Sequence, residues 1–248
     1  MTRYLVLRLE GPLVAFGDVM VDAIGPVRDT PSASMLTGLM ANALGVRREE
    51  GHRLARLQDR LEFAVRLDRR AERFTDFQTA RLDGADRGWT TRGRPEGRAG
   101  GADTYRGPHI RYREHDADVS AAVVLRLHPA EERPDLDTIA LALDEPARPL
   151  FLGRKPCLPA APIFAGFVDA SDLYAALTMV PLAKPCRGAR DSGVLVVLPA
   201  DAPRPETFHP IHVCDRRDWI AGIHCGDTLL YAGTVPRNGF PHHEGAAA

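Results

Sequence analysis

The stretch RYLVLRLEGP, residues 3–12, carries apolar residues at every second position. In an extended chain this alternation places three leucines on one face: Leu5, Leu7 and Leu9. A period of two is typical of a β-strand, and a Gly-Pro pair commonly ends one. The sequence therefore predicts a first strand that ends at Gly11-Pro12.

The periodicity becomes helical after this strand. In TPSASMLTGLMANALGV, residues 30–46, apolar residues recur every three or four positions, Ser32 or Ser34 can cap a helix, and Gly45 can end it. Further elements follow in order: a helical stretch around 49–60, strands at 61–68 and 118–128, and a helix opened by Pro134-Asp135. This order is most of a split β-α-β, ferredoxin-like unit of the α+β class. PLFLG, residues 149–153, could supply its closing strand or lie beside it.

The connection between the strands at 61–68 and 118–128 is unusually long. Hairpin loops usually have about 2–5 residues, whereas this connection runs from about residue 69 to 117. Residues 81–113 contain eight arginines and four acidic residues, with Trp89, Tyr105 and Tyr112 among them. The segment is either a solvated loop or an arm that grips an anionic polymer, because arginines neutralise phosphates and aromatic rings stack on bases.

The second half of the chain predicts a smaller, β-rich part. A helix is expected near 170–180, a buried strand at 193–199, and two late strands near 208–214 and 228–235. The final HHEGAAA has the composition of a disordered tail.

Composition narrows the class of protein. The formal net charge of −1 excludes a protein that coats nucleic acid over its whole surface, but it does not exclude a local basic surface. The four cysteines lie far apart, the start shows no signal-peptide pattern, and no apolar run approaches the ~20 residues of a membrane span. We expect a cytoplasmic protein with reduced thiols and no membrane contact.

Sequence motifs for catalysis and metal binding are weak. No nucleophile elbow, P-loop or dinucleotide fingerprint is present. Histidines and cysteines between residues 209 and 225 match no closed zinc site, so we expect no metal and no cofactor. A metal-independent ribonuclease that uses Tyr112 with His109 or His115 stays possible at this point.

Two segments could bind phosphate. Ser32 and Ser34 either cap a helix or, with Arg28 just upstream, form a phosphate seat at its N-terminus. In LFLGRKPCLP, residues 150–159, prolines stiffen a loop that presents Arg154 and Lys155.

Several segments together resemble one family. In chain order, over roughly residues 3–225, these are YLVLRLEGPLVAFG, TPSASMLTGLMANALGV, YREHDADVSAAVVL, LFLGRKPCLP and RRDWIAG. They are similar to the "Cas-five" family of type I-E CRISPR Cascade. Ala33 stands where the family often has Arg, and Asp29-Thr30 stand where it has Arg-Phe, which suggests a divergent branch.

This resemblance implies a ferredoxin-like (RRM-related) fold in which the long connection forms a hairpin "thumb". The expected division is a ferredoxin-like RNA-binding domain at 1–155 with the thumb at about 69–117, a C-terminal extension at 156–240 that packs on it, and a disordered tail at 241–248. It also implies a non-catalytic subunit that binds the 5′ handle of crRNA, caps the backbone filament, contacts the backbone and large subunits, and meets target DNA only through the complex. Relatives of type I-C cut the repeat RNA themselves.

The residues we expect to bind RNA lie in three segments. They are Arg28, Ser32, Ser34, Arg81, Arg111, Tyr112, Arg113, Arg154 and Lys155. Two alternatives stay open, namely a metal-independent endoribonuclease that processes CRISPR repeat RNA and an oligomerisation module that binds no RNA.

Overall fold

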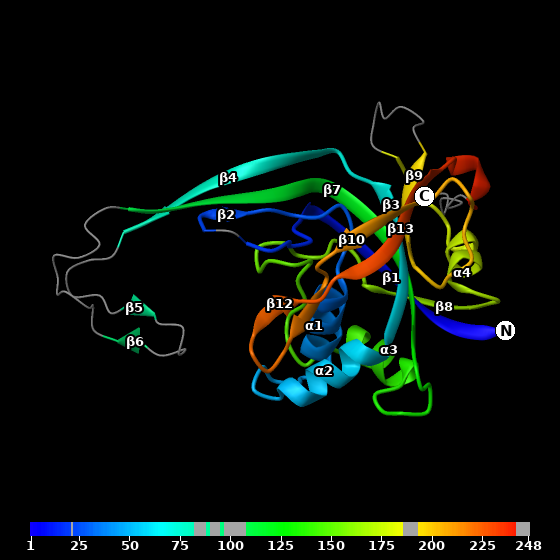
Figure 1. Cartoon of the computed structure of the whole chain (residues 1–248), viewed down its shortest axis with the longest axis horizontal. Helices are drawn as coiled ribbons and strands as arrows, with labels where there is room; N and C mark the ends of the chain where they lie inside the picture. The colour runs from blue at the N-terminus through cyan, green and yellow to red at the C-terminus, as the bar shows by residue number, and fades with distance from the viewer. Residues whose placement is uncertain (21, 82–87, 90–94, 97–107, 186–192, 242–248) are drawn as a thin grey trace.

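A computed structural model describes residues 1–20, 22–81, 88–89, 95–96, 108–185 and 193–241. Within these residues the chain combines helices with one large, mostly antiparallel sheet of nine strands (Figure 1). The helices are α1 (Ala33–Ala43), α2 (Gly51–Arg60), α3 (Leu136–Asp144) and α4 (Leu173–Met179). The strands are β1 (Thr2–Val14), β2 (Ile24–Gly25), β3 (Leu61–Arg69), β4 (Glu72–Ala80), β5 (Gly88–Trp89), β6 (Pro95–Glu96), β7 (His109–Leu127), β8 (Phe164–Ala170), β9 (Val194–Pro199), β10 (His209–Val213), β11 (Arg216–Asp218), β12 (Ile223–Cys225) and β13 (Thr228–Val235).

The large sheet has the strand order β10-β13-β9-β3-β7-β1-β8, with β2 and β4 paired to β7 outside this path. The first strand shows the predicted alternation, because Leu5, Leu7 and Leu9 enter the core cluster that also contains buried residues of α1, α2 and α3. Tyr4 and Val6 enter a second cluster with α4 and β9. Both faces of the sheet centre are therefore buried, with α1, α2 and α3 together on one side (Figure 1).

The prediction that β1 ends at Gly11-Pro12 is wrong. The strand continues to Val14, because Gly11 and Leu13 still pair with β7. The ladder between β1 and β8 stops at Leu7, so Pro12 lies at an exposed edge where its missing N–H removes no bond of that ladder.

PLFLG forms no strand. Leu152 is fully buried in a turn, where its N–H donates to the carbonyl of Cys157 at 2.7 Å and its carbonyl accepts from the Ala15 N–H at 3.0 Å. The position beside β1 is taken by β8 instead.

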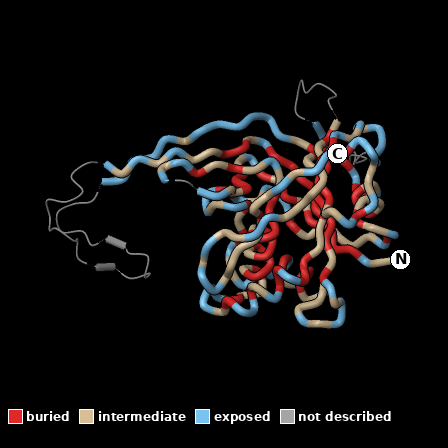
Figure 2. Tube along the Cα trace, in the orientation of Figure 1, coloured by how far each residue is buried: buried red, intermediate tan, exposed pale blue. Residues whose placement is uncertain are grey.

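The long connection between β3 and the core part of β7 begins and ends as a regular antiparallel ladder. Residues Glu72–Ala80 of β4 pair with His109–Ala117 of β7, so the predicted strand at 118–128 is too short at its start. We call these two paired segments the β4–β7 arm. Figures 1 and 2 show that the arm extends away from the body of the molecule and that its surface is largely exposed. Residues 82–87, 90–94 and 97–107 lie outside the described residues, together with five of the arginines counted above.

The C-terminal part extends the same sheet. β9 pairs with β3, and β13 and β10 follow outward, while β8 lies at the opposite edge. The division of the chain at residue 155 stays a prediction, and so does the disordered tail, of which residues 242–248 lie outside the described part. Among the described residues, no helix is long and apolar enough to cross a bilayer.

Candidate nucleic-acid interface

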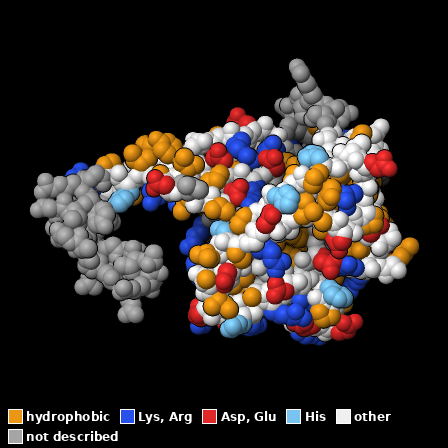
Figure 3. All heavy atoms as spheres, viewed as in Figure 1, with side chains coloured by type: hydrophobic (Ala, Val, Ile, Leu, Met, Phe, Trp, Pro, Cys, Tyr) orange, Lys and Arg blue, Asp and Glu red, His pale blue; other side chains and the backbone are white. Residues whose placement is uncertain are grey.

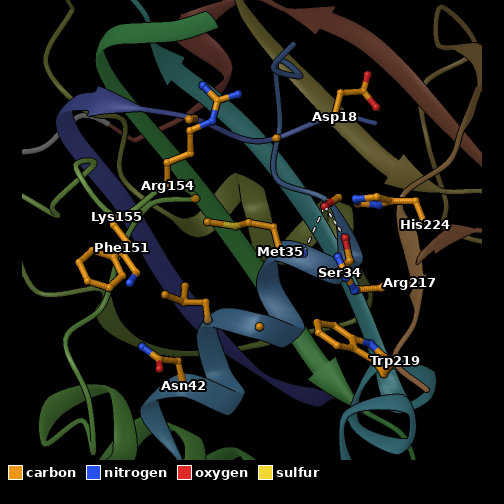
Figure 4. Close-up of a pocket in the computed structure, with 16 residues that line it drawn as sticks. Asp18, Ser34, Met35, Asn42, Phe151, Arg154, Lys155, Arg217, Trp219 and His224 are labelled. Carbon is orange, nitrogen blue, oxygen red and sulfur yellow. Dashed lines mark hydrogen bonds between the residues drawn. The ribbon is translucent and has the colours of Figure 1, made fainter. Parts of the chain in front are cut away.

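A pocket of about 500 Å³ lies alongside α1 (Figure 4). Its walls come from α1, from the loop at 151–155, and from β11 with β12 and the turn between them. We call it the α1 pocket. It brings together four of the predicted residues: Ser32, Ser34, Arg154 and Lys155. Segments that are far apart in the sequence thus meet at one concave surface.

The N-terminus of α1 is capped by the protein itself. The Ser32 Oγ accepts from the Met35 N–H at 3.2 Å and lies 3.0 Å from the Ser34 Oγ. Asp215 occupies the place that an anion would take, because its Oδ2 accepts from the Ala33 N–H at 3.3 Å and its carbonyl accepts from the Ser34 N–H at 2.9 Å. The serines line the pocket, but the amides of a phosphate seat are already used.

Arg28 is also engaged internally. Its Nη2 lies 2.7 Å from the Asp18 Oδ1 and donates to the Cys214 carbonyl at 2.6 Å. Together with Ser32 it lines a neighbouring hollow beside β10 and β13, and not the α1 pocket. To contact a phosphate, Arg28 must exchange the Asp18 carboxylate for it.

Arg154 and Lys155 have different environments although they are adjacent. Arg154 donates from Nη1 to the Glu114 carbonyl at 2.6 Å and from Nη2 to the Gly25 carbonyl at 2.8 Å, so its side chain joins the loop to β7 and β2. Burial lowers the pKa of Arg154, and the positive charge of Arg113 lowers it further. Lys155 is exposed, and it lies beside Phe151 at the edge of the pocket (Figure 4). Lys155 is the cation of this pair that can meet a phosphate without loss of an internal bond.

Sequence reasoning missed the residues that β11, β12 and their turn contribute. Arg217, Trp219 and His224 line the α1 pocket, and the Arg217 guanidinium lies 5.6 Å from the Trp219 ring centroid. The Trp219 Nε1 and the His224 Nδ1 are buried and have no hydrogen-bond partner within the described residues. RRDWIAG was the available signal, because it places Trp219 beside an arginine pair.

Burial lowers the pKa of His224, and the charges of Arg217 and Arg28 add to this effect. The imidazole is therefore neutral at pH 7, and one of its nitrogens can accept a hydrogen bond. The indole N–H of Trp219 can only donate. The pocket thus offers an unpaired donor and an unpaired imidazole nitrogen next to an aromatic surface.

The other predicted residues lie on the arm, away from the α1 pocket. Tyr112 pairs with Phe77 in the ladder, and their ring centroids are 5.4 Å apart. Arg111 and Arg113 flank Tyr112 in the strand, so their side chains leave the opposite face. Arg81 is exposed just after the end of β4. Figure 3 shows hydrophobic side chains along the described part of the arm.

The arrangement of β7 separates the residues of the ribonuclease alternative. The ladder with β4 is regular from His109 to Ala117, and Tyr112 lies three positions from both His109 and His115. Because side chains alternate in a strand, Tyr112 and either histidine point to opposite faces. His115 is buried and stacks on Phe74, with the ring centroids 5.8 Å apart. Neither pair can act on one phosphodiester from this geometry.

The structure also describes the Cys157 thiol and the residue types that could hold a metal ion. Cys157 is completely buried, and burial raises the pKa of its thiol, so it is a packing residue. In the described part of the chain, no group of three or more His, Cys, Asp or Glu residues is arranged to hold a metal ion.

Comparison with known proteins decides the family. The model of the family described as CRISPR-associated protein (Cas_Cas5) matches residues 4–223. The chain belongs to this family. The resemblance seen in the sequence is therefore confirmed, and the Cas5 match covers α1, the arm, the loop at 151–155 and β11, and it ends at the first residue of β12.

Relatives of the Cas5 chain agree with this assignment. CRISPR system Cascade subunit CasD of Escherichia coli (strain K12) is 31% identical over 182 residues, which are 71% of this chain and 76% of CasD. A chain of a solved CRISPR RNA-guided surveillance complex matches with a TM-score of 0.66 at 24% identity, over 94% of this chain and 89% of that chain. A crystal structure of a Cas protein matches with a TM-score of 0.63 at 25% identity, over 96% and 98%.

Proposed function

We propose that this Cas5-family chain is a non-catalytic subunit of a type I CRISPR Cascade surveillance complex, which binds the 5′ handle of crRNA and caps the backbone filament. The family assignment and the likeness to CasD support the proposal that the chain works within a Cascade complex. The observation that carries the proposal is the α1 pocket, where Trp219 and His224 hold buried polar atoms that have no hydrogen-bond partner within the described residues, and which an exposed cation, Lys155, also lines. Buried polar groups without partners are costly, and a ligand that pairs them recovers that cost.

The pocket suits a nucleotide of a single-stranded RNA. Phe151 and Trp219 provide aromatic surfaces for a splayed base, and Lys155 can pair with its phosphate. The Trp219 N–H and the His224 Nδ1 can meet polar atoms on the base edge. Because such contacts depend on base identity, the pocket would read part of a fixed handle sequence, while Arg111 and Arg113 of the arm, and Arg81 just beyond it, bind the RNA backbone.

The fold proposal follows from the sheet order. In the run β3-β7-β1-β8, each strand is antiparallel to its neighbours. α1 and α2 connect β1 to β3, and α3 connects β7 to β8. This order supports a ferredoxin-like, RRM-related unit, in which we propose that the β4–β7 arm is the thumb. Because this unit includes β8 (Phe164–Ala170), we propose that it extends beyond the predicted boundary at residue 155, and that β9, β10 and β13 are the main strands of the smaller β-rich part that follows.

The expected partners are crRNA and the backbone and large subunits of Cascade, with target DNA reached only through the complex, in the cytoplasm. The relative's name, Cascade subunit CasD, supports an assembled state.

A binding and cleavage assay tests the function. The full chain is titrated with a repeat-derived RNA in EDTA, and the RNA is then run on a denaturing gel. Specific binding with intact RNA is expected. Specific cleavage would establish the endoribonuclease alternative, and self-association with no RNA affinity at low salt would establish the oligomerisation module.

A further inference from the structure

A second pocket, of about 490 Å³, lies between α1, α2 and the start of α3. Figure 1 shows these helices on the lower side of the body, whereas the β4–β7 arm leaves from its upper part. Its walls are apolar: Ala41, Leu44, Val46, Leu54, Leu57 and Pro134. Four arginines also line it: Arg53, Arg56, Arg60 and Arg133. We call it the arginine pocket.

Arg60 is the buried cation of this pocket, with a side chain that is 1% exposed. Its Nη1 donates to the Pro134 carbonyl at 3.1 Å, and its Nη2 donates to the carbonyls of Pro129, at 2.9 Å, and Glu132. The Nε is buried and has no hydrogen-bond partner within the described residues. A buried donor without an acceptor is unfavourable, so the site is incomplete as it stands.

The carboxylates near the pocket do not balance its positive charge. Glu132 is the one carboxylate among the described lining residues, and Arg56 binds both of its oxygens. The Arg60 Nε lies 3.8 Å from the same carboxylate, which is beyond hydrogen-bond distance. Two guanidinium groups therefore share a single negative charge.

Other nearby acids are already used. Glu50 pairs with Arg53, and Asp135 caps α3 through Thr138 and lies 3.5 Å from Arg133. Burial lowers the pKa of Arg60, the negative charge of Glu132 raises it, and the positive charge of Arg56 lowers it again. One buried positive charge is thus left without a full partner at the base of an apolar hollow.

We propose that the arginine pocket binds an acidic, apolar peptide segment of a protein partner, with a carboxylate of the peptide beside Arg56 and Arg60 and an apolar side chain on the leucine wall. A carboxylate supplies the missing charge, and guanidinium–carboxylate pairs are strong when desolvated. An RNA segment fits less well, because no Phe, Tyr or Trp is among the described lining residues to stack on a base. This inference is independent of RNA binding at the α1 pocket.

NMR titration of the full-length, isotope-labelled chain tests the proposal. The probe is the capped peptide acetyl-Leu-Glu-Leu-amide, and its matched control is acetyl-Leu-Gln-Leu-amide. The acidic peptide is expected to shift the amide signals of residues 52–60 and 132–138 and to bind about tenfold more tightly than the control, which is the effect of about one charge-assisted bond. Equal shifts with both peptides would overturn the proposal.

Two variants act in opposite directions. Arg56→Gln leaves Arg60 and Glu132 as a balanced pair, so binding of the acidic peptide should weaken by about tenfold. Glu132→Gln removes the competing internal carboxylate, so binding should tighten, and a purely structural pocket would not show this gain. Arg47→Gln, an exposed position outside the pocket, is the control and should leave binding unchanged. Failure of Glu132→Gln to tighten binding, or stronger shifts of the same amides by a single-stranded RNA, would overturn the assignment.

Discussion

The Nη2 of Arg154 lies 2.8 Å from the carbonyl oxygen of Gly25, so a side chain from the loop at 151–155 holds the short strand β2 against the β7 strand of the arm. A Cβ at Gly25 would lie only 2.9 Å from this nitrogen, which explains why the position suits glycine. Arg154 binds β7 through its other terminal nitrogen. Its first role is therefore to fasten three chain segments together.

Arg154→Ala should lower the free energy of unfolding by about 2 kcal/mol, because two backbone carbonyls lose a charged donor. Chemical denaturation followed by circular dichroism measures this loss. Lys155→Ala, at the exposed neighbouring position, should leave the free energy of unfolding unchanged. Equal stability of both variants would contradict the fastening role.

Lys155→Ala should weaken binding of repeat-derived RNA by about three- to tenfold and reduce the slope of log affinity against log salt by about one unit. Fluorescence anisotropy at several salt concentrations measures both quantities. Lys184→Ala is the matched control, because Lys184 is the other lysine of the chain and is exposed outside the α1 pocket. An equal loss of RNA affinity in both variants would mean that Lys155 acts through the overall charge of the protein and makes no specific phosphate contact.

Trp219→Leu should weaken RNA binding by about tenfold or more if a base stacks on the indole, since each stacked base contributes about 1–3 kcal/mol. Binding is measured by anisotropy, as for Lys155, and a thermal melt checks that the variant is folded. Ile220→Ala, at the exposed next position, serves as the control. Full affinity in folded Trp219→Leu would exclude the α1 pocket as a base site.

Asp215→Ala should destabilise the protein by about 1–2 kcal/mol, because the N-terminus of α1 loses a capping carboxylate. The Thr228 hydroxyl, which donates to the Asp215 Oδ1 at 2.7 Å, loses its acceptor as well. Denaturant unfolding measures the loss, with Asp201→Ala in an exposed turn as the control. A stability equal to that of the unchanged chain would show that the serines alone suffice as caps.

Acid should destabilise the fold through His115. Burial lowers the pKa of His115 and the positive charge of Arg154 adds to this shift, so the unfolded chain takes up a proton at a higher pH than the folded chain does. Stability from this group is complete above the unfolded pKa of about 6.5 and falls as the pH drops below it. His115→Gln should show a smaller drop in melting temperature between about pH 7.5 and pH 5.5, and an unchanged drop would contradict this assignment.

The sequence predicted those helices and strands whose periodicity and end signals lie within the element itself. The leucines at alternate positions of β1 could be assigned to one face because a strand has a period of two, and Ser32 and Gly45 mark the ends of α1 as predicted. β11 and β12 were missed because strands of three residues are too short to show a period. The continuation of β1 past Pro12 depends on its pairing with β7 and on the end of the β8 ladder at Leu7, neither of which is encoded by residues near Pro12.

Side-chain roles were harder to predict than elements. Arg28 and Arg154 have the residue type of a phosphate contact, yet their donors are used by Asp18, Cys214, Gly25 and Glu114. Most of these partners are distant in the sequence, so their use could be seen only after folding. Lys155 kept its predicted exposure because no such partner reaches it in the described structure.

A single backbone, β7, forms both the middle of the sheet and one side of the arm. Tyr112 on the arm and Leu125 beside Leu5 in the core belong to this continuous strand. The arm is therefore a continuous extension of the sheet, and Arg154 binds it to β2 and to the loop at 151–155. A displacement of the outer half of the arm therefore acts on the same backbone that pairs with β1 in the core of the sheet.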